Sequence, residues 1–233
     1  MNVPAPHTPV RADGTLARQR LLDAALRLFA ENGYQKTSTR AIADTAGVNL
    51  GAITYYFGDK AKLYQAVFCE SFSDAATSPD ITTARGCLPD FGAPGLGSEA
   101  ALAGFFRNFL QPLKLGEQVR LVMRLHFREL VEPSGALNEG MDEDIGALYF
   151  ALAELAARRL GINATDPDAR RLAHAILGLA FHFFVTQDLV GQVSPELVAT
   201  PDAIDTLAER LATYATGMLD AEARRRQPTG SPS

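Results

Sequence analysis

Several polar side chains lie between residues 38 and 60, in a segment that is otherwise mostly small and apolar. Ser38 and Thr39 supply hydroxyl groups, and the guanidinium group of Arg40 follows them directly. Hydroxyls and free backbone N–H groups at the start of a helix suit a phosphate. An arginine can bind a guanine edge through two hydrogen bonds or hold a phosphate, although it can also be an ordinary surface side chain. The chemistry of these three side chains permits contact with a phosphate or a base edge, if the fold exposes them at the start of a helix.

A second set of candidate residues lies on the helix predicted for residues 117–131. His126 and Glu129 are three residues apart, so they share a helical face and could bind a metal or act as an acid–base pair. The alternative is a hydrogen-bonded structural pair. The same two interpretations apply to His174 and His182.

Two short helices that cross at a tight turn, between Ser38 and Phe57, must position these polar side chains. Gly47 lies where the backbone needs a positive φ without the steric cost of a Cβ. Ser38 can cap the first helix and Asn49 the second. Apolar residues recur at helical spacing, namely Ile42, Ala43, Ala46, Val48 and Ile53. The pattern predicts a helix-turn-helix, whose second helix enters the major groove.

The flanking segments complete a small helical domain. Residues 18–32 are amphipathic and end at Gly33, and Asp59 begins another predicted helix that reaches Phe72. Over residues 18–67 the chain resembles the DNA-binding domain of the TetR family of transcriptional regulators. The resemblance is carried by Phe29, Gly33, Tyr34, Ile42, Ala43, Ala46, Gly47, Val48, Gly51, Tyr55, Phe57, Lys60 and Leu63. It implies that this segment binds operator DNA.

Transferred residue by residue, the resemblance implies a set of DNA contacts. The predicted DNA-binding residues are Ser38, Thr39, Arg40, Asn49, Leu50, Gly51, Thr54, Tyr55 and Lys60. Gly51 lets the backbone approach the groove, Thr54 can contact a base, and Leu50 offers only apolar contact. Tyr55 and Lys60 are expected to hold phosphates on either flank.

The sequence departs from the commonest pattern of the family at two residues in the second helix region. Leu50 stands where a polar residue is frequent in the family, and Thr54 stands where the first of two aromatics is usual. These departures narrow the subgroup, and they leave the operator sequence open. Tyr56 is expected in the core rather than on DNA.

The charge of the chain is divided between its two parts. The 233-residue chain has a net charge of −5, but residues 1–64 hold eight Lys plus Arg against five Asp plus Glu, or +3, so the remainder carries −8. A local positive charge fits a protein whose one end meets phosphates. Cys69 and Cys87 match no disulfide framework or metal spacing. Residues 1–14 lack the apolar region expected of a signal peptide, and no run reaches about 18 apolar residues. We therefore expect a reduced, cytoplasmic protein that does not enter a membrane.

The remainder of the chain is predicted to be helical after one long loop. Residues 73–98 are rich in Gly, Pro, Ser and Thr, which indicates a loop that is either disordered or a functional lid. Ser98 can cap the next helix. Further helices are predicted at residues 117–131 and 137–160, and two more begin at Asp166-Pro167 and Thr200-Pro201. Residues 119–137 and 178–184 resemble the CecR-like branch of the family.

These patterns predict an all-α protein with two domains. We assign residues 1–14 to a flexible arm, 15–58 to the helix-turn-helix domain, 59–226 to a helical regulatory and dimerisation domain, and 227–233 to a disordered tail. The last two helices, near residues 168–189 and 202–222, can pack within one chain or against a second copy. The resemblance implies a four-helix dimer interface, and a twofold dimer reads two half-sites. We expect the Arg224–Arg226 run to be a solvated tail rather than a contact to DNA or lipid.

The regulatory domain is expected to hold a mostly apolar pocket for a small hydrophobic or amphipathic effector, with no cofactor and no obligatory metal. The predicted lining consists of Phe105, Phe109, Val122, His126, Tyr149, Leu177, Phe181 and His182. Ordinary core packing explains the same residues. Arg124 and Arg128 can pair with acids or face an anionic ligand.

The leading interpretation is a ligand-responsive regulator, most often a repressor in this family, that binds a palindromic operator as a homodimer. An all-helical enzyme is the second, but the chain has no evident nucleophile, glycine-rich phosphate loop or complete metal set. The third is a DNA-binding module without an effector. It is hard to reconcile with so large a C-terminal domain.

Overall fold

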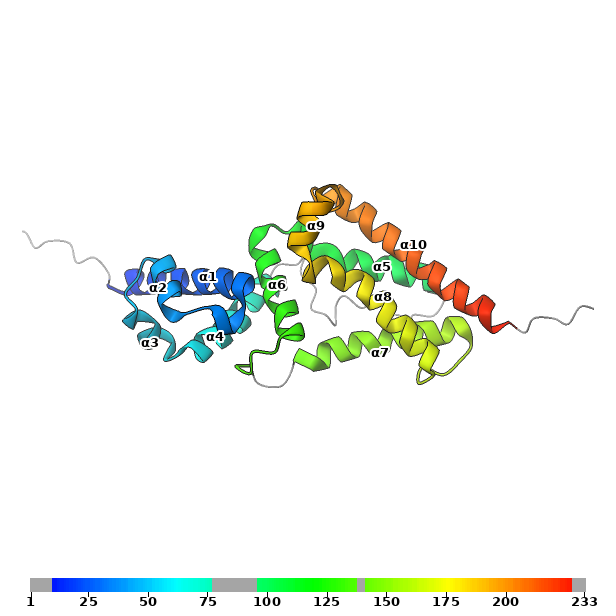
Figure 1. Cartoon of the computed structure of the whole chain (residues 1–233), viewed down its shortest axis with the longest axis horizontal. Helices are drawn as coiled ribbons and strands as arrows, with labels where there is room; N and C mark the ends of the chain where they lie inside the picture. Colours follow the sequence, from blue (N-terminus) through cyan, green and yellow to red (C-terminus); the bar gives the residue numbers. More distant parts are fainter. Residues whose placement is uncertain (1–9, 77–95, 138–140, 228–233) are drawn as a thin grey trace, which may run out of the picture.

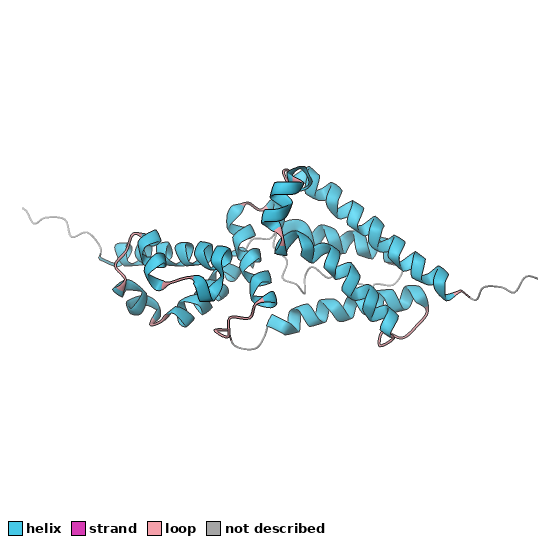
Figure 2. Cartoon of the chain, viewed as in Figure 1, coloured by secondary structure: helices cyan, strands magenta, loops and turns pink. Residues whose placement is uncertain are grey.

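The structure is a computed structural model that describes residues 10–76, 96–137 and 141–227, and every regular element within these ranges is helical. The α-helices are α1 (Val10–Lys36), α2 (Thr39–Ala46), α3 (Gly51–Phe57), α4 (Lys60–Ala76), α5 (Ser98–Leu110), α6 (Glu117–Val131), α7 (Met141–Leu160), α8 (Pro167–Val185), α9 (Gln187–Val193) and α10 (Pro201–Arg226). Two short 3-10 turns, η1 (Gln111–Lys114) and η2 (Pro195–Leu197), complete the set. Helices α1–α4 form one end of an elongated molecule, here called the head, and α5–α10 form the body (Figure 1). The helical content confirms the all-α prediction (Figure 2).

The helix-turn-helix forms as its local sequence predicts. Ser38 Oγ accepts a hydrogen bond from the backbone N–H of Ala41 at 3.1 Å, and Asn49 Oδ1 accepts one from the N–H of Gly51 at 2.8 Å. Gly47 ends α2 in the left-handed region, with φ 64° and ψ 39°. The Ser38 cap and the turn glycine are therefore confirmed, whereas the N-cap position of α3 is Leu50, and Asn49 bonds to the helix from one residue before it.

Helix α1 differs from the prediction at its start. It begins at Val10, so residues 10–14 are helical although the sequence placed them in a flexible arm. Its other end agrees with the prediction, because Gly33 leaves helical geometry with φ 81° and ψ 167°. Thr37 Oγ1 then donates to the carbonyl oxygens of Gly33 at 2.8 Å and Leu28 at 3.1 Å, which satisfies two terminal acceptors.

The core of the head is built around aromatic rings. Phe29 and Tyr64 are buried, and their ring centroids are 4.8 Å apart in an edge-to-face arrangement. The ring centroid of Tyr34 lies 5.0 Å from that of Tyr64. The same apolar cluster includes Leu121, Val122 and Leu125 of α6. The head therefore packs directly on α6, and the domain boundary expected after residue 58 remains a prediction.

The body has its own core, in which α10 lies along α5, and α7 lies along α8 (Figure 1). A cluster of five phenylalanine rings, with centroids 4.8–6.1 Å apart for the neighbouring pairs, lies inside it: Phe105, Phe109, Phe127, Phe181 and Phe184. Helix α10 has an apolar stripe that is buried within the same chain, although the resemblance implied a dimer interface for this helix; the stripe consists of Ile204, Leu207, Ala208, Leu211 and Ala215. Leu211 is only 4% exposed and Ala215 is fully buried.

Three predicted details of the body helices are wrong. Gly97 occupies the N-cap position of α5 in extended geometry, so Ser98 is the first helical residue and does not cap the helix. Leu137 lies outside a helix, and α7 is described from Met141. Helix α8 ends at Val185, and α9 continues at an angle of 78°, so residues 168–189 are divided between two helices.

Most of the predicted loop 73–98, residues 77–95, lies outside the described residues, as does the tail from residue 228. Residues 73–76 belong to α4, so that helix is one turn longer than predicted. Within the described ranges no single helix has the length and apolar character needed to span a membrane, and the bent pair α8–α9 meets that test by length and composition only.

Candidate nucleic-acid interface

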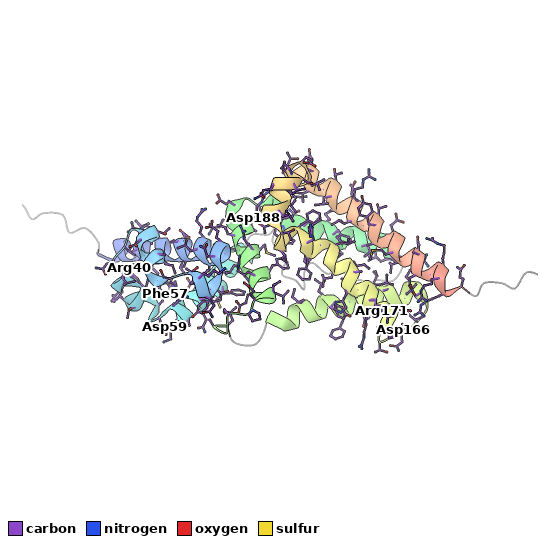
Figure 3. The ribbon with its side chains drawn as sticks, in the orientation of Figure 1. Arg40, Phe57, Asp59, Asp166, Arg171 and Asp188 are labelled. Atoms are coloured by element: carbon purple, nitrogen blue, oxygen red, sulfur yellow. The ribbon has the colours of Figure 1, made fainter. Side chains whose placement is uncertain are left out.

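The predicted DNA contacts lie in α2 and α3, in the residues just before these helices and at the first residue of α4. Ile42, Ala46 and Ile53 are buried in the head, which leaves the opposite faces of both helices in solvent. The exposed members of the predicted set are Ser38, Arg40, Asn49, Leu50, Gly51, Thr54 and Tyr55, while Thr39 and Lys60 are half-buried. Arg40 lies at the outer end of the head, away from the body (Figure 3). Seven of the nine residues are therefore exposed to solvent, and their contact with DNA remains a prediction.

The start of α2 offers donors for an anion. Ser38 Oγ accepts the capping hydrogen bond from Ala41 N–H, and its hydroxyl hydrogen can still be donated outwards. Backbone N–H groups in the first turn of a helix have no partner within that helix. Arg40, exposed in the same turn, can extend to a phosphate or a base edge. This arrangement suits a DNA backbone.

Helix α3 exposes two large side chains. Leu50 is 46% exposed and Tyr55 is 82% exposed, which is a high value for an aromatic ring. The Tyr55 ring rests edge-on against Tyr56, with centroids 4.8 Å apart. Tyr56 itself is half-buried and packs against the head core, which confirms its predicted core role. The exposed side chains of Leu50 and Tyr55 and the backbone of Gly51 are available for groove contact.

Lys60 is held close to the head core. Its Nζ lies 4.3 Å from the centroid of the Tyr34 ring, a cation–π geometry, and partial burial lowers the pKa of its ammonium group. Two basic side chains outside the predicted set lie near the same surface. Arg20 Nη1 comes within 4.0 Å of a Cβ built on Gly47, and exposed Lys62 lies beside Gly58. Arg20 belongs to α1, so only the folded structure brings it to the turn.

The predicted effector residues are distributed over several places. Phe105, Phe109 and Phe181 meet in the phenylalanine cluster, and Leu177 is buried in the same core. Val122 belongs instead to the head cluster, and His182 is exposed.

Tyr149 lies at the α7–α8 contact. Its hydroxyl donates to the carbonyl oxygen of Arg170 at 3.2 Å, and its ring centroid is 4.2 Å from that of the exposed His174. The eight residues predicted to bind an effector therefore do not share one enclosed lining. Ligand binding by any of them remains a prediction.

His126 and Glu129 each have structural partners, but they do not bond to one another, so the hydrogen-bonded pair predicted from their spacing does not form. His126 Nδ1 is 2.9 Å from the carbonyl oxygen of Val122, its ring lies 3.9 Å from that of Phe68, and burial lowers its pKa to about 4. Glu129 accepts hydrogen bonds from Tyr64 Oη at 2.7 Å and from the Ser134 hydroxyl at 2.8 Å. Both residues therefore have structural hydrogen bonds, with different partners. Among the described residues no group of three or more His, Cys, Asp or Glu could hold a metal.

The arginines of α6 have structural partners, as one of the two sequence interpretations expected. Arg124 pairs with Asp188 of α9. Arg128 pairs with Glu132 at 3.4 Å and also donates to the carbonyl oxygens of Ala30 and Glu31 near the end of α1, at 3.3 and 3.1 Å.

The arginine run at the end of the chain is not a solvated tail. Arg225 and Arg226 belong to the last turn of α10, and both pair with Asp168 in the first turn of α8, at 2.7 and 2.5 Å. Both also pair with Glu222, so these guanidinium groups join two helix ends.

Comparison with known proteins agrees with this geometry. Residues 21–67 match the model of bacterial regulatory proteins of the tetR family, and residues 98–221 match the model of the C-terminal domain of the HTH-type transcriptional dual regulator CecR. The chain belongs to the TetR family. It is a DNA-binding transcriptional regulator and not an enzyme.

Individual relatives support this membership. The dual regulator CecR of Shigella flexneri is 31% identical over 185 residues, which cover 78% of this chain and 80% of CecR. The repressor AcnR of Corynebacterium glutamicum is 38% identical over 74 residues, which cover 32% of this chain and 38% of AcnR. A TetR-like regulator from Rhodococcus sp. RHA1 shares the fold, with a TM-score of 0.55 at 21% identity over 93% of this chain and 99% of that one.

Proposed function

We propose that this regulator represses transcription by binding a palindromic operator as a homodimer, and that a small hydrophobic or amphipathic effector releases it. The observation that carries the proposal is the outward face of α2 and α3, where Arg40, Thr54 and Tyr55 are exposed on a well-packed head. Such a face matches the geometry by which a helix-turn-helix reads DNA. The dual regulator CecR and the repressor AcnR among the relatives support the assignment.

The proposed dimer uses α8 and α10, but through other residues than the apolar stripe of α10. Because that stripe is buried within the chain, the available surface is the opposite side of each helix. Gly178 of α8 and Gly217 of α10 are exposed, and a Cβ built on either has no neighbour within 4 Å. Tyr214 is 56% exposed on the same helix as Gly217. Small residues let two helices approach closely, and a twofold axis there would present two heads to two half-sites.

The proposed effector response needs a mechanical link between body and head, and α6 supplies one. It carries Glu129, bonded to Tyr64 of α4, and Arg128, bonded to carbonyl oxygens of α1. A ligand that shifts α6 would therefore tilt α1 and α4, the two helices of the head to which it is bonded. A coupling free energy of about 1–3 kcal/mol would change operator affinity roughly 5- to 150-fold.

A gel-shift titration with DNA from upstream of the gene for this chain tests the DNA-binding part of the proposal. We expect retention of that duplex over a scrambled duplex of equal length, with an affinity that falls steeply as salt rises from 50 to 200 mM. Equal affinity for both duplexes across this range would contradict a specific operator. Release by a cellular small-molecule fraction would support the effector response, and the absence of any release would favour a DNA-binding module without an effector.

A further inference from the structure

A cleft between α6 and the end of α8 lies outside the pocket predicted from the sequence. Its volume is about 260 Å³, and residues of α6 form one wall while Phe184 and Val185 form the other. Sites for drug-sized ligands are usually about 300–1,000 Å³. The cleft therefore suits a smaller ligand, about the size of one or two fused rings.

The floor of the cleft is aromatic and its rim is apolar. The rings of Phe127 and Phe184 stack with centroids 4.8 Å apart and an interplanar angle of 23°, and both residues are at least 95% buried. Val131 and Val185 at the rim are 62% and 50% exposed. A flat apolar group placed between the valines would remove this surface from water, which is favourable by about 25 cal/mol per Å².

The charges around the cleft favour an anion at one position. Arg124, Arg128 and Glu132 line it, and Glu132 pairs with Arg128 at 3.4 Å. Arg124 pairs instead with Asp188 of α9, whose side chain is 67% exposed while that of Arg124 is 23% exposed. Asp188 lies where α9 approaches α6 (Figure 3).

The guanidinium of Arg124 is therefore already arranged to hold a carboxylate. That carboxylate comes from a solvent-exposed side chain, and an exposed ion pair contributes about 0–1 kcal/mol, so another carboxylate can replace it at small cost.

We propose that this cleft binds a small aromatic carboxylate, with its ring between Val131 and Val185, next to the buried Phe127–Phe184 pair, and its carboxylate in place of Asp188 on Arg124. This ligand would be the effector of the proposed function, and the proposal rests on that function. Arg128, on the same wall, also donates to α1, so a ligand here touches the link between body and head.

The test is a fluorescence-anisotropy titration of 2-naphthoate with the full chain in the absence of DNA, which is convenient because the chain has no tryptophan. We expect Arg124→Ala to weaken binding about tenfold or more, since a charge-assisted pair is lost. We expect Asp188→Asn to tighten binding several-fold, because the competing carboxylate loses its charge. Arg159→Ala, which removes an exposed arginine paired with Asp220 at 2.6 Å, is the matched control and should bind as the wild type does.

Neutral 2-naphthamide separates charge recognition from apolar adsorption, and it should bind at least about tenfold more weakly than the acid. Equal binding of acid and amide, or unchanged or weaker binding to Asp188→Asn, would overturn the inference even if Arg124→Ala failed to fold. Melting temperatures identify any misfolded variant. Operator binding without naphthoate binding would remove this inference and leave the proposed function standing, whereas naphthoate binding without operator binding would do the reverse.

Discussion

Arg40 and Lys60 have different surroundings, and we expect them to act differently on DNA. Arg40 is exposed at the start of α2, so Arg40→Ala should cost about 1–3 kcal/mol of operator affinity and relax the preference for operator over random DNA. Lys60→Ala removes a phosphate contact, so it should weaken binding to all sequences alike and lower the slope of log affinity against log salt by about one. Anisotropy titrations on both duplexes at several salt concentrations measure these effects.

Arg107→Ala, which removes an exposed arginine of α5 in the body, is the control for these titrations and should leave both affinities unchanged. Lys60 also contacts the Tyr34 ring, so the melting temperature of its variant has to accompany the affinity. Equal losses on operator and random DNA for Arg40→Ala would show that Arg40 holds phosphate and reads no base.

The buried ring of His126 predicts a pH dependence of stability. Burial lowers its pKa to about 4 in the folded chain, against about 6.5 when unfolded. Between these values the unfolded chain binds a proton that the folded chain does not, so stability is complete above pH 6.5 and falls as the pH drops toward 4. At pH 5 the expected loss from this group is about 2 kcal/mol.

Urea unfolding at pH 7.5 and pH 5 measures this loss. His126→Leu should remove about that much of the pH dependence, while His182→Gln, which alters an exposed histidine, should retain it. A His126→Leu variant as sensitive to acid as the wild type would contradict the role assigned to burial.

At the scale of elements, α6 is held to the head by a buried hydrogen bond. Glu129 is 7% exposed, and Tyr64 Oη donates to it at 2.7 Å. Tyr64→Phe leaves the carboxylate without one of its donors in a buried site, so it should cost about 1–3 kcal/mol of unfolding free energy. Chemical denaturation measures the loss, with Tyr214→Phe as a control on an exposed tyrosine. A change below about 0.5 kcal/mol would mean that water replaces the Tyr64 hydroxyl.

The elements also show which features of the fold could be predicted from sequence. Ser38, Gly47 and Asn49 bond to residues at most four positions away, so the local sequence is enough to predict their roles. The break after Val185 was missed because no Gly or Pro marks it; Thr186 there donates its hydroxyl to the carbonyl oxygen of His182 at 2.6 Å.

Contacts that depend on tertiary structure could not be predicted in the same way. An apolar stripe such as that of Leu211 reports burial, but it does not report which helix covers it. Arg20 of α1 approaches the turn at Gly47 only because the two helices pack together. The different partners of His126 and Glu129 likewise depend on tertiary packing, since Glu129 bonds to Tyr64 of α4.

At the scale of the whole molecule, the dimer can be tested by substitutions on the two sides of α10. Gly217 is exposed, and a Cβ at this position has no neighbour within 4 Å. Gly217→Arg should therefore leave the chain folded. Replacing a glycine inside a helix also stabilises that helix by up to about 1 kcal/mol. In the proposed dimer, Gly217→Arg places a long charged side chain between close helices. We expect a folded monomer in sedimentation equilibrium, with operator affinity reduced because only one half-site is held.

Leu211→Glu probes the opposite side of the same helix. It buries an unpaired carboxylate in the core of the chain itself, which costs several kcal/mol, so it should lower the melting temperature strongly instead of producing a folded monomer. Gly146→Arg on α7, another glycine with open space around its Cβ position, should remain dimeric. If Gly217→Arg sediments as a dimer like Gly146→Arg, the two heads are joined through a surface other than this side of α10, and the spacing of the half-sites has to be derived from that surface instead.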